Sequence, residues 1–383
     1  MKVIVPEDHG ATDVLRQELD SVVVRPHQYP GDTYVPLWFC FQALNDSRRD
    51  LAQARIVIED LEPGHDTYQP YWKHCVWSRD GVNWERVPDA AKRLSDTTLT
   101  IETPLAVDEG RWVAIIFPLP YSWYEHLCNE LITPPVPALS TAGLSTAWSL
   151  RRRHLGDSVQ GRPLYAFFIQ GEQGPARRNL LIVAGQHAVE QSGKMFAESV
   201  LRGYHSGSFA GTPMETLLQT HNITVVPLAN PDGCYAGRMN SNAEGVVMGS
   251  AADNSVETQA VLALIDELQP HILINCHGWG NAMGDPPYED VYRFSDSDSL
   301  FVHLREHVLG CSSSGLPHLF RDDFRLESHA RQGYGTECAI TEVNYHYYLP
   351  PDGGPPRQPT RAEIEARIGE YLTAIAGFCR EAK

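Results

Sequence analysis

Residues 179–193 read NLLIVAGQHAVEQSG. The apolar run LLIVA is typical of a short strand that is buried on both faces. A helical pattern begins at about Lys194, so the polar residues in between lie where a strand ends and a helix begins. In α/β sheets, binding sites lie beyond the carboxyl ends of the strands. His187 and Glu190, three positions apart, are therefore candidates for a functional site.

The alternation of strands and helices extends over most of the chain beyond about residue 120. The runs expected to form strands are PLYAFFI (163–169), NLLIVA (179–184), ITVVPL (223–228), HILINC (271–276) and CAIT (338–341). Helical patterns cover about 194–204, 212–221, 254–268, 299–309 and 361–379. Strands that are apolar on both faces and alternate with helices predict an α/β domain with a mixed, mostly parallel sheet flanked by helices.

The first 120 residues have a different pattern, with short apolar or alternating runs and turn residues between them. The clearest unit is WKHCVWSRDGVNWERV, in which Asp80-Gly81 predicts a hairpin between two strands. Regularly spaced short strands predict an all-β sandwich. Its tryptophans are read as core residues, with a carbohydrate platform as the alternative. We therefore expect a β-sandwich domain over 1–120 and a catalytic domain over 121–383.

Composition excludes some classes of partner. The 383 residues carry a net charge of −17, which argues against nucleic acid and against an acidic membrane surface. No apolar run is long enough for a transmembrane helix, and the first residues lack the apolar core of a signal peptide.

The eight cysteines form no C-x-x-C pair, and several lie in apolar runs. They are expected to be buried thiols of a reducing compartment, which predicts a cytoplasmic protein.

Polar residues suited to hold a metal follow three of the predicted strands. His187 and Glu190 follow NLLIVA, His277 follows HILINC, and Glu342 follows CAIT. Two histidines and one carboxylate are typical of a catalytic zinc site that keeps a fourth position open for water. An H-x-x-E pair alone is frequent by chance. The joint occurrence at strand ends predicts one Zn²⁺ ion held by His187, Glu190 and His277.

Two further residues would complete a hydrolytic site. Glu342 is expected to act as general base on the attacking water and later as general acid, although it could instead be a salt-bridge partner. Arg238, which follows the NPDG turn at 230–233, is expected to polarise the substrate carbonyl and stabilise the oxyanion. Asn240, two residues further on, is a candidate for substrate contact.

The ordered set LGDSVQGRPLYAFFI, HAVE, NPDG followed by arginine, CHG and AITEV resembles the zinc metallocarboxypeptidases. It is most similar to their cytosolic-carboxypeptidase-like branch, in which a small β-sandwich precedes the peptidase domain. The resemblance implies zinc ligation by His187, Glu190 and His277, a catalytic role for Glu342 and carbonyl assistance by Arg238. It also implies a mixed eight-stranded sheet, and it leaves a homo-oligomer open.

The sequence departs from the family pattern where the leaving part of the substrate is recognised. In the family an Asn-Arg pair grips the free carboxylate of the last residue, and here Gly249 and Ser250 align with that pair. Such a buried contact is worth roughly 2–5 kcal/mol. Asn275 stands where the related branch has Asp. Arginines that would substitute for the missing one are Arg293, Arg321 and Arg325.

These features predict a zinc-dependent hydrolase that cleaves an amide bond with altered leaving-group recognition, and a specialised amidase is the favoured form. The substrate would be a small-molecule amide or a peptide. A metallocarboxypeptidase or deglutamylase acting on peptide C-termini is the alternative within the family. A zinc-bearing pseudoenzyme that only binds its ligand is the alternative outside it, although binding alone requires neither Glu342 nor Arg238. An esterase would use the same machinery.

Two loops rich in aromatic residues and proline follow the second histidine and the catalytic glutamate. They are expected to overhang the pocket, because loops at strand ends carry most substrate contacts. The candidates for substrate contact are Trp279, Tyr288, Tyr345 and His346, with Tyr334 as a weaker candidate for a mobile tyrosine.

Overall fold

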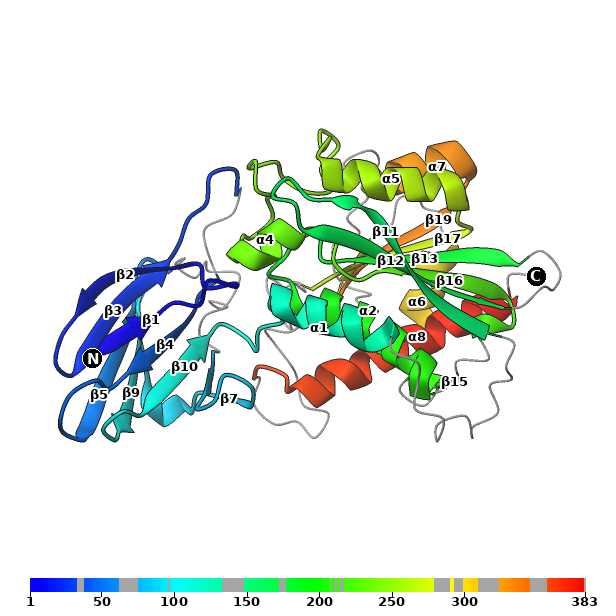
Figure 1. Ribbon diagram of the computed structural model, residues 1–383. Helices are drawn as coiled ribbons and strands as arrows, with labels where there is room; N and C mark the ends of the chain where they lie inside the picture. The colour runs from blue at the N-terminus through cyan, green and yellow to red at the C-terminus, as the bar shows by residue number, and fades with distance from the viewer. Residues whose placement is uncertain are drawn as a thin grey trace.

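The computed structural model places an all-β domain beside a larger α/β domain (Figure 1). It describes residues 1–32, 38–61, 75–95, 97–132, 148–171, 177–206, 208–209, 212–213, 217–278, 290–292, 299–308, 324–344 and 357–381. Within these ranges no helix is long and apolar enough to cross a membrane.

The N-terminal domain is a sandwich of two five-stranded sheets, ordered β1-β4-β10-β6-β7 and β2-β3-β5-β9-β8. Its strands are β1 (Lys2–Ile4), β2 (Thr12–Gln17), β3 (Ser21–Pro26), β4 (Cys40–Leu44), β5 (Leu51–Ile58), β6 (Val76–Ser78), β7 (Trp84–Arg86), β8 (Lys92–Leu94), β9 (Leu99–Leu105) and β10 (Gly110–Ala114). The hairpin expected at Asp80-Gly81 joins β6 to β7, which pair antiparallel. The predicted all-β sandwich is confirmed.

The described part of the second domain contains a seven-stranded sheet in the order β11-β12-β16-β13-β17-β19-β18. Its strands are β11 (Trp148–Asp157), β12 (Pro163–Gly171), β13 (Arg178–Ala184), β16 (His221–Val226), β17 (Ile272–His277), β18 (Asp290–Tyr292) and β19 (Glu337–Glu342). The central strands β16, β13, β17 and β19 are parallel, whereas β11, β12 and β18 are antiparallel to their neighbours. The predicted mixed sheet is confirmed.

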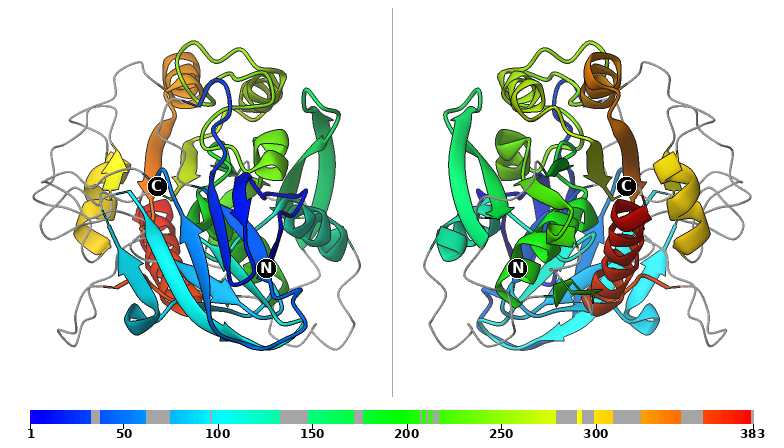
Figure 2. Two further views of the ribbon diagram at one scale, coloured as in Figure 1. Left: turned by 90° about the vertical axis from the view of Figure 1, so that its left-hand side faces the viewer. Right: turned by 90° about the vertical axis from the view of Figure 1, so that its right-hand side faces the viewer.

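Helices cover both faces of this sheet (Figure 1, Figure 2). They are α1 (Tyr121–Ile132), α2 (Gln191–Ser206), α4 (Pro231–Ala236), α5 (Val256–Leu268), α6 (Ser299–His307), α7 (Arg325–Tyr334) and α8 (Arg361–Glu381). Leu181 and Val183 of β13 belong to the apolar cluster that includes residues of α5 and α7. Leu180 and Ile182 belong to the cluster that includes residues of α2, α6 and α8. The central strand is thus apolar throughout because each face meets a helical layer.

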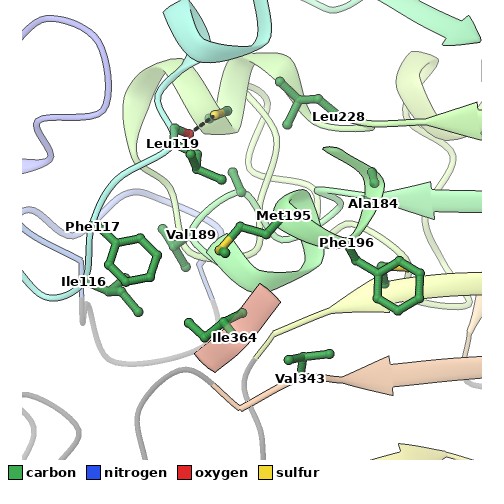
Figure 3. Close-up of a cluster of buried hydrophobic side chains, with 14 of the residues drawn as sticks. Ile116, Phe117, Leu119, Ala184, Val189, Met195, Phe196, Leu228, Val343 and Ile364 are labelled. Atoms are coloured by element: carbon green, nitrogen blue, oxygen red, sulfur yellow. Dashed lines mark hydrogen bonds between the residues drawn. The ribbon is translucent and has the colours of Figure 1, made fainter. Parts of the chain in front are cut away.

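One apolar cluster continues from the sandwich into the α/β domain. Figure 3 shows the part around the connecting segment, with Ile116, Phe117, Leu119, Val189, Met195 and Ile364. Lys194, whose side chain is almost fully buried, donates from Nζ to the Leu119 carbonyl at 2.6 Å. The Leu119 N–H in turn donates to the Gln191 side chain at 2.8 Å. The segment that connects the two domains is therefore hydrogen-bonded, through Leu119, to the first turn of α2, next to Glu190.

Some elements differ from the prediction. The NPDG segment begins a short helix, α4, because the Asn230 side chain caps it by accepting from the Gly233 N–H at 2.9 Å. The helix expected over 212–221 is wrong at both ends, because Thr212–Pro213 is strand β15, paired with β14 (Ser208–Phe209), and His221 begins β16. Strand β11 and helices α1 and α7 were not expected from the sequence.

Candidate metal and active site

Three parallel strands end at the edge of the sheet where the predicted site lies. In the register of the sheet, Ala184 of β13 is opposite Cys276 of β17, and His277 is opposite Glu342 of β19. The chain leaves β13 through Gly185, whose φ of 67° favours glycine and whose Cβ would overlap Leu228. This sharp exit leads directly to His187 and Glu190.

His187, Glu190 and His277, called here the His–Glu–His triad, form the described group suited to a metal ion. Each residue offers a ligand atom, and these atoms lie within 4.8 Å of one another. The Nδ1 atom of His187 lies 2.8 Å from Glu190 Oε1, and the Nδ1 atom of His277 lies 2.8 Å from Glu190 Oε2. The two imidazole rings lie edge to face at an interplanar angle of 75°, with their centroids 4.7 Å apart. The strand ends therefore bring together the three predicted ligands.

Charge within the triad suits a cation. Burial lowers the pKa of the His187 imidazole, but the adjacent Glu190 carboxylate outweighs burial, so that the pKa is raised. The same two effects raise the pKa of His277. Burial alone would raise the pKa of Glu190, yet the two imidazoles hold it well below its usual range. Two imidazoles, in their neutral form, and an ionised carboxylate are a donor set that binds zinc, so the residues present fit this metal.

A buried polar network lies behind the triad. The Asn275 amide donates to the Gln186 side-chain oxygen and to Glu327 Oε1, each at 2.6 Å. Gln186 directly precedes His187, and Asn275 is two residues before His277. Burial raises the pKa of the Glu327 carboxyl group, which favours its neutral form. Asn275, a departure from the family pattern, thus links segments that carry two of the three ligands.

Glu342 is the last residue of β19 and is 8% exposed. It is opposite His277 in the neighbouring strand, and its negative charge helps to raise the pKa of that histidine. Adjacent strands lie about 4.8 Å apart, so the carboxylate is next to the triad. A carboxylate at this position has the proximity that a general base toward a water molecule needs.

Arg238 is engaged by residues around the contact between the two domains. Its guanidinium donates to the Pro30 carbonyl and to the Ser241 hydroxyl, each at 3.2 Å, and lies over the ring of Tyr29. A role at the substrate carbonyl stays a prediction. Asn240 is buried, and its backbone is linked to the triad through Met248. Its carbonyl accepts from the Met248 N–H at 2.8 Å, and the Met248 carbonyl lies 3.3 Å from His187 Nε2.

The segment that departs from the family pattern borders the same site. Gly249 has a φ of 78°, and a Cβ there would lie 3.2 Å from the Gln186 side chain. The Ser250 hydroxyl donates to the Val247 carbonyl at 3.1 Å. The N–H of Arg325 donates to the Gly249 carbonyl at 2.9 Å, and Phe324 forms an isolated β-bridge with Ser250. Arg325, one of the three arginines considered as substitutes, is therefore hydrogen-bonded to this segment through its backbone.

The structure places Tyr334 beyond the opposite end of β19 from Glu342. This residue ends α7 and is 37% exposed, and its hydroxyl donates to Asp266 at 2.9 Å. It precedes the amino end of β19, whereas Glu342 lies at the carboxyl end, roughly 17 Å further along the strand. The other predicted contacts and substitutes lie outside the described residues: Trp279, Tyr288, Tyr345, His346, Arg293 and Arg321.

Sequence reasoning missed three residues that the structure places around the site, namely Gln186, Glu327 and Asp32. Gln186 adjoins the H-x-x-E pair and could have been considered as part of it. Glu327 has no recognisable motif, and its role depends on how α7 packs on the sheet. Asp32 belongs to the sandwich, and its carboxylate contributes to the raised pKa of His187. Long-range contacts of this kind leave no local pattern in a sequence.

Comparison with known proteins agrees with the fold and the site. Residues 149–246 match the family model of the zinc carboxypeptidases, peptidase family M14. Cytosolic carboxypeptidase 2 of Danio rerio is 24% identical over 231 residues, which are 54% of this chain and 30% of that relative. The chain thus spans less than a third of this curated relative.

Solved structures match over the whole chain. The metallo-carboxypeptidase from Burkholderia cenocepacia superposes with a TM-score of 0.76 at 19% identity and covers 100% of both chains. A metallo-carboxypeptidase from Pseudomonas aeruginosa gives a TM-score of 0.76 at 18% identity, also over 100% of both chains. The fold is therefore that of the metallocarboxypeptidases.

Residues 149–246 are thus similar to the zinc carboxypeptidase family, and the chain has the metallocarboxypeptidase fold, in agreement with the resemblance stated from its motifs. Proteins of this family use one zinc ion, and the His–Glu–His triad fits that ion.

Proposed function

We propose that the protein is a zinc-dependent hydrolase that cleaves an amide bond and recognises the leaving part of its substrate differently from ordinary carboxypeptidases. The observation that carries this proposal is the convergence of the triad with Glu342, which come from three adjacent parallel strands. Metal binding alone would not require a carboxylate at the end of β19.

The roles of the residues follow from this geometry. Zinc, when held by His187, Glu190 and His277, would supply Lewis-acid activation of water and of the substrate carbonyl. Glu342 would take a proton from the attacking water and pass it to the leaving amine. Gln186, Asn275 and Glu327 would hold the segments that carry the two histidines, because each of these side chains is buried.

Altered recognition is supported by the residues at the positions of the family's Asn-Arg pair. Gly249 has no side chain, and the Ser250 hydroxyl is used within the protein. Neither residue supplies the bidentate charged contact that holds a carboxylate in an ordinary carboxypeptidase. We therefore favour a specialised amidase that acts on a small-molecule amide or a modified peptide. A carboxypeptidase becomes the second candidate if another arginine binds the carboxylate, and the position of Arg325 favours considering it.

We also propose that the protein acts in the cytoplasm. The described cysteines are all free and buried, which suits a reducing compartment. The curated relative is named a cytosolic carboxypeptidase.

Hydrolysis assays with zinc-loaded protein and the Glu342→Gln variant test the proposed chemistry. The variant should bind zinc and fold as the wild type does but lose nearly all turnover of blocked dipeptides and small acyl-amino compounds. Glu337→Gln is the matched control, because Glu337 lies at the other end of the same strand. Equal activity of wild type and Glu342→Gln would contradict the proposal. Ligand binding without turnover by either protein would favour the pseudoenzyme.

A further inference from the structure

A groove lies between the two domains, next to the segment that connects them. It is lined by the hairpin of β6 and β7, by the connecting segment at 117–120, and by the start of α1 and of α8. Its volume is about 720 Å³, and small-molecule sites of roughly 300–1,000 Å³ are frequent at domain interfaces. None of its lining residues belongs to the His–Glu–His triad, and Glu342 does not line it. This interdomain groove is therefore separate from the proposed hydrolytic site.

Most of the walls of the interdomain groove are aromatic or proline side chains. Trp84 comes from the sandwich and Trp123 from α1, and both are partly buried. The Trp84 indole N–H donates to the Gly81 carbonyl at 3.0 Å, which fixes this ring within the hairpin. Such rigid apolar surfaces suit a ligand with a flat ring, because aromatic rings pack offset or edge to face on one another. The other apolar lining residues include Val82, Phe117, Pro118, Pro120 and Pro359.

Arg86 brings an unpaired positive charge to the groove. Within the described part of the chain its guanidinium has no hydrogen bond and no ion pair, and both burial and the like charge of Arg357 lower its pKa. Among the neighbouring carboxylates, Glu363 attracts Arg86 most strongly. That carboxylate is already bound by both terminal nitrogens of Arg357, which lower its pKa to about 2. An anion that enters the groove would therefore find Arg86 without a competing partner.

The other charged groups that line the groove are engaged within the protein. Arg361 donates to two carboxylates, at 2.9 and 3.1 Å. Glu85 accepts from the Trp77 indole N–H at 2.9 Å, and the His126 ring lies 3.8 Å from a carboxylate of its own helix. Helix α8 also begins here, at Arg361, and the amino end of a helix favours negative charge. The groove thus suits an anion, although the chain as a whole carries a net charge of −17.

We propose that the interdomain groove binds an aromatic carboxylate, whose ring packs against Trp84 and Trp123 and whose anionic group is held by Arg86. A guanidinium presents a planar fork of donors that matches a carboxylate. A neutral carbohydrate, the alternative considered for the tryptophans, would leave Arg86 without a counter-charge. The ligand would contact both domains, because Trp84 and Arg86 belong to the sandwich and Trp123 to the α/β domain.

Two matched probes test this site by calorimetry on the zinc-loaded protein. The probes, 2-naphthoate and 2-naphthamide, share a ring system and differ in the carboxylate. Naphthoate should bind with a stoichiometry of one and roughly 10-fold more tightly than naphthamide, because it adds a charge-assisted pair to the same apolar contacts. Equal affinities of the two probes, or no saturable binding of naphthoate, would overturn the inference.

Substitutions in the groove locate the bound probe. In Arg86→Met the affinity for naphthoate should fall to that for naphthamide, whereas naphthamide should bind as it does to the wild type. Val82→Asp places a negative charge on an exposed lining residue and should weaken the binding of naphthoate alone. Arg93→Met is the matched control, because Arg93 is an exposed sandwich residue that pairs with Glu102 at 3.1 Å and does not line the groove. An unchanged preference for naphthoate in Arg86→Met would contradict the proposed site.

The His277→Ala variant distinguishes the groove from the zinc site. It should bind naphthoate as tightly as the wild type does, because no lining residue of the groove is a predicted zinc ligand. A loss of naphthoate binding that accompanies the loss of zinc would place the probe in the hydrolytic site and so refute the inference. Wild-type affinity in His277→Ala, together with the lost preference in Arg86→Met, would establish the groove as a second binding site.

Discussion

Asp32, in the N-terminal domain, accepts hydrogen bonds from both the backbone N–H and the hydroxyl of Ser241, at 3.0 and 2.5 Å. Its carboxylate also accepts from the Met239 N–H at 3.0 Å. Next to it, the backbone of Gly31 lies so close to Gly245 that a side chain at Gly31 would overlap it. The sandwich therefore fixes the segment that carries Asn240 and forms one boundary of the active site.

Replacing Asp32 should impair catalysis more than it impairs folding. Hydrogen bonds to a charged group contribute about 1.5–3 kcal/mol, so Asp32→Ala should lower kcat/KM by roughly 10-fold or more. Asp32→Asn should retain part of the activity, because its side-chain oxygen still accepts. Asp13→Ala is the control, since Asp13 pairs with Arg25 and His27 within the sandwich. Equal activity of the two alanine variants would show that Asp32 serves only the domain interface.

Zinc should bind with a stoichiometry of one and stabilise the fold. Removing His277 leaves Glu190 and His187 without their third partner, so His277→Ala should contain far less zinc than the wild type by atomic absorption. Wild-type protein should lose about 3 kcal/mol of stability when a chelator removes a metal that was present at 100 times its Kd. The control His303→Ala changes a buried histidine that contacts the Ala374 carbonyl, and it should keep its zinc. Full zinc content in His277→Ala would refute the ligand set.

The buried Glu327 carboxyl should make stability depend on pH. Its pKa is raised in the folded protein, so its contribution is fully present below the unfolded pKa and is lost as pH rises through the folded pKa. Wild type should therefore lose stability relative to Glu327→Gln as the pH increases, because glutamine still accepts from Asn275 without ionising. Thermal unfolding of both proteins between pH 5 and pH 9, with the exposed Glu306→Gln as a charge control, measures this difference. If the difference in stability between wild type and Glu327→Gln stays constant across that range, the pKa of Glu327 is not raised in the folded protein.

The sequence predicted both domains and the metal triad because their signals are local or periodic. Central strands such as β13 are apolar on both faces, and His187 and Glu190 follow one of them directly. His277 and Glu342 could be added because parallel strands bring their carboxyl ends to one edge. Tyr334 lies at the opposite end of β19 from Glu342 because the length of the strand separates the two residues.

Contacts between distant segments were beyond such reasoning. Asp32 reaches Ser241 across 209 positions of the chain, and Arg325 reaches Gly249 because α7 packs beside the turn held by Asp253. These contacts depend on how the sandwich and α7 dock, which composition and periodicity do not encode. Contacts between distant segments around the candidate site are consequently less visible in the sequence than the His–Glu–His triad.

Gly249 offers a test of how closely this turn is coupled to the triad. Its φ of 78° strains any other residue, and a Cβ there would also lie 3.2 Å from Gln186. Gly161 has a similar φ of 80° but has no atom within 4 Å of its Cβ position. Each alanine variant should lose about 1–2 kcal/mol of stability from the backbone alone.

The two variants should differ in activity. Gly249→Ala should push Gln186 away from Asn275 and shift His187, which would lower kcat/KM by roughly 10-fold or more, since small displacements of catalytic groups are costly. Gly161→Ala should keep its activity despite a similar fall in melting temperature. If both variants keep wild-type kcat/KM, the turn at 248–250 does not position the triad. A loss confined to Gly249→Ala would show that the turn which replaces the carboxylate-binding pair also supports the metal ligands.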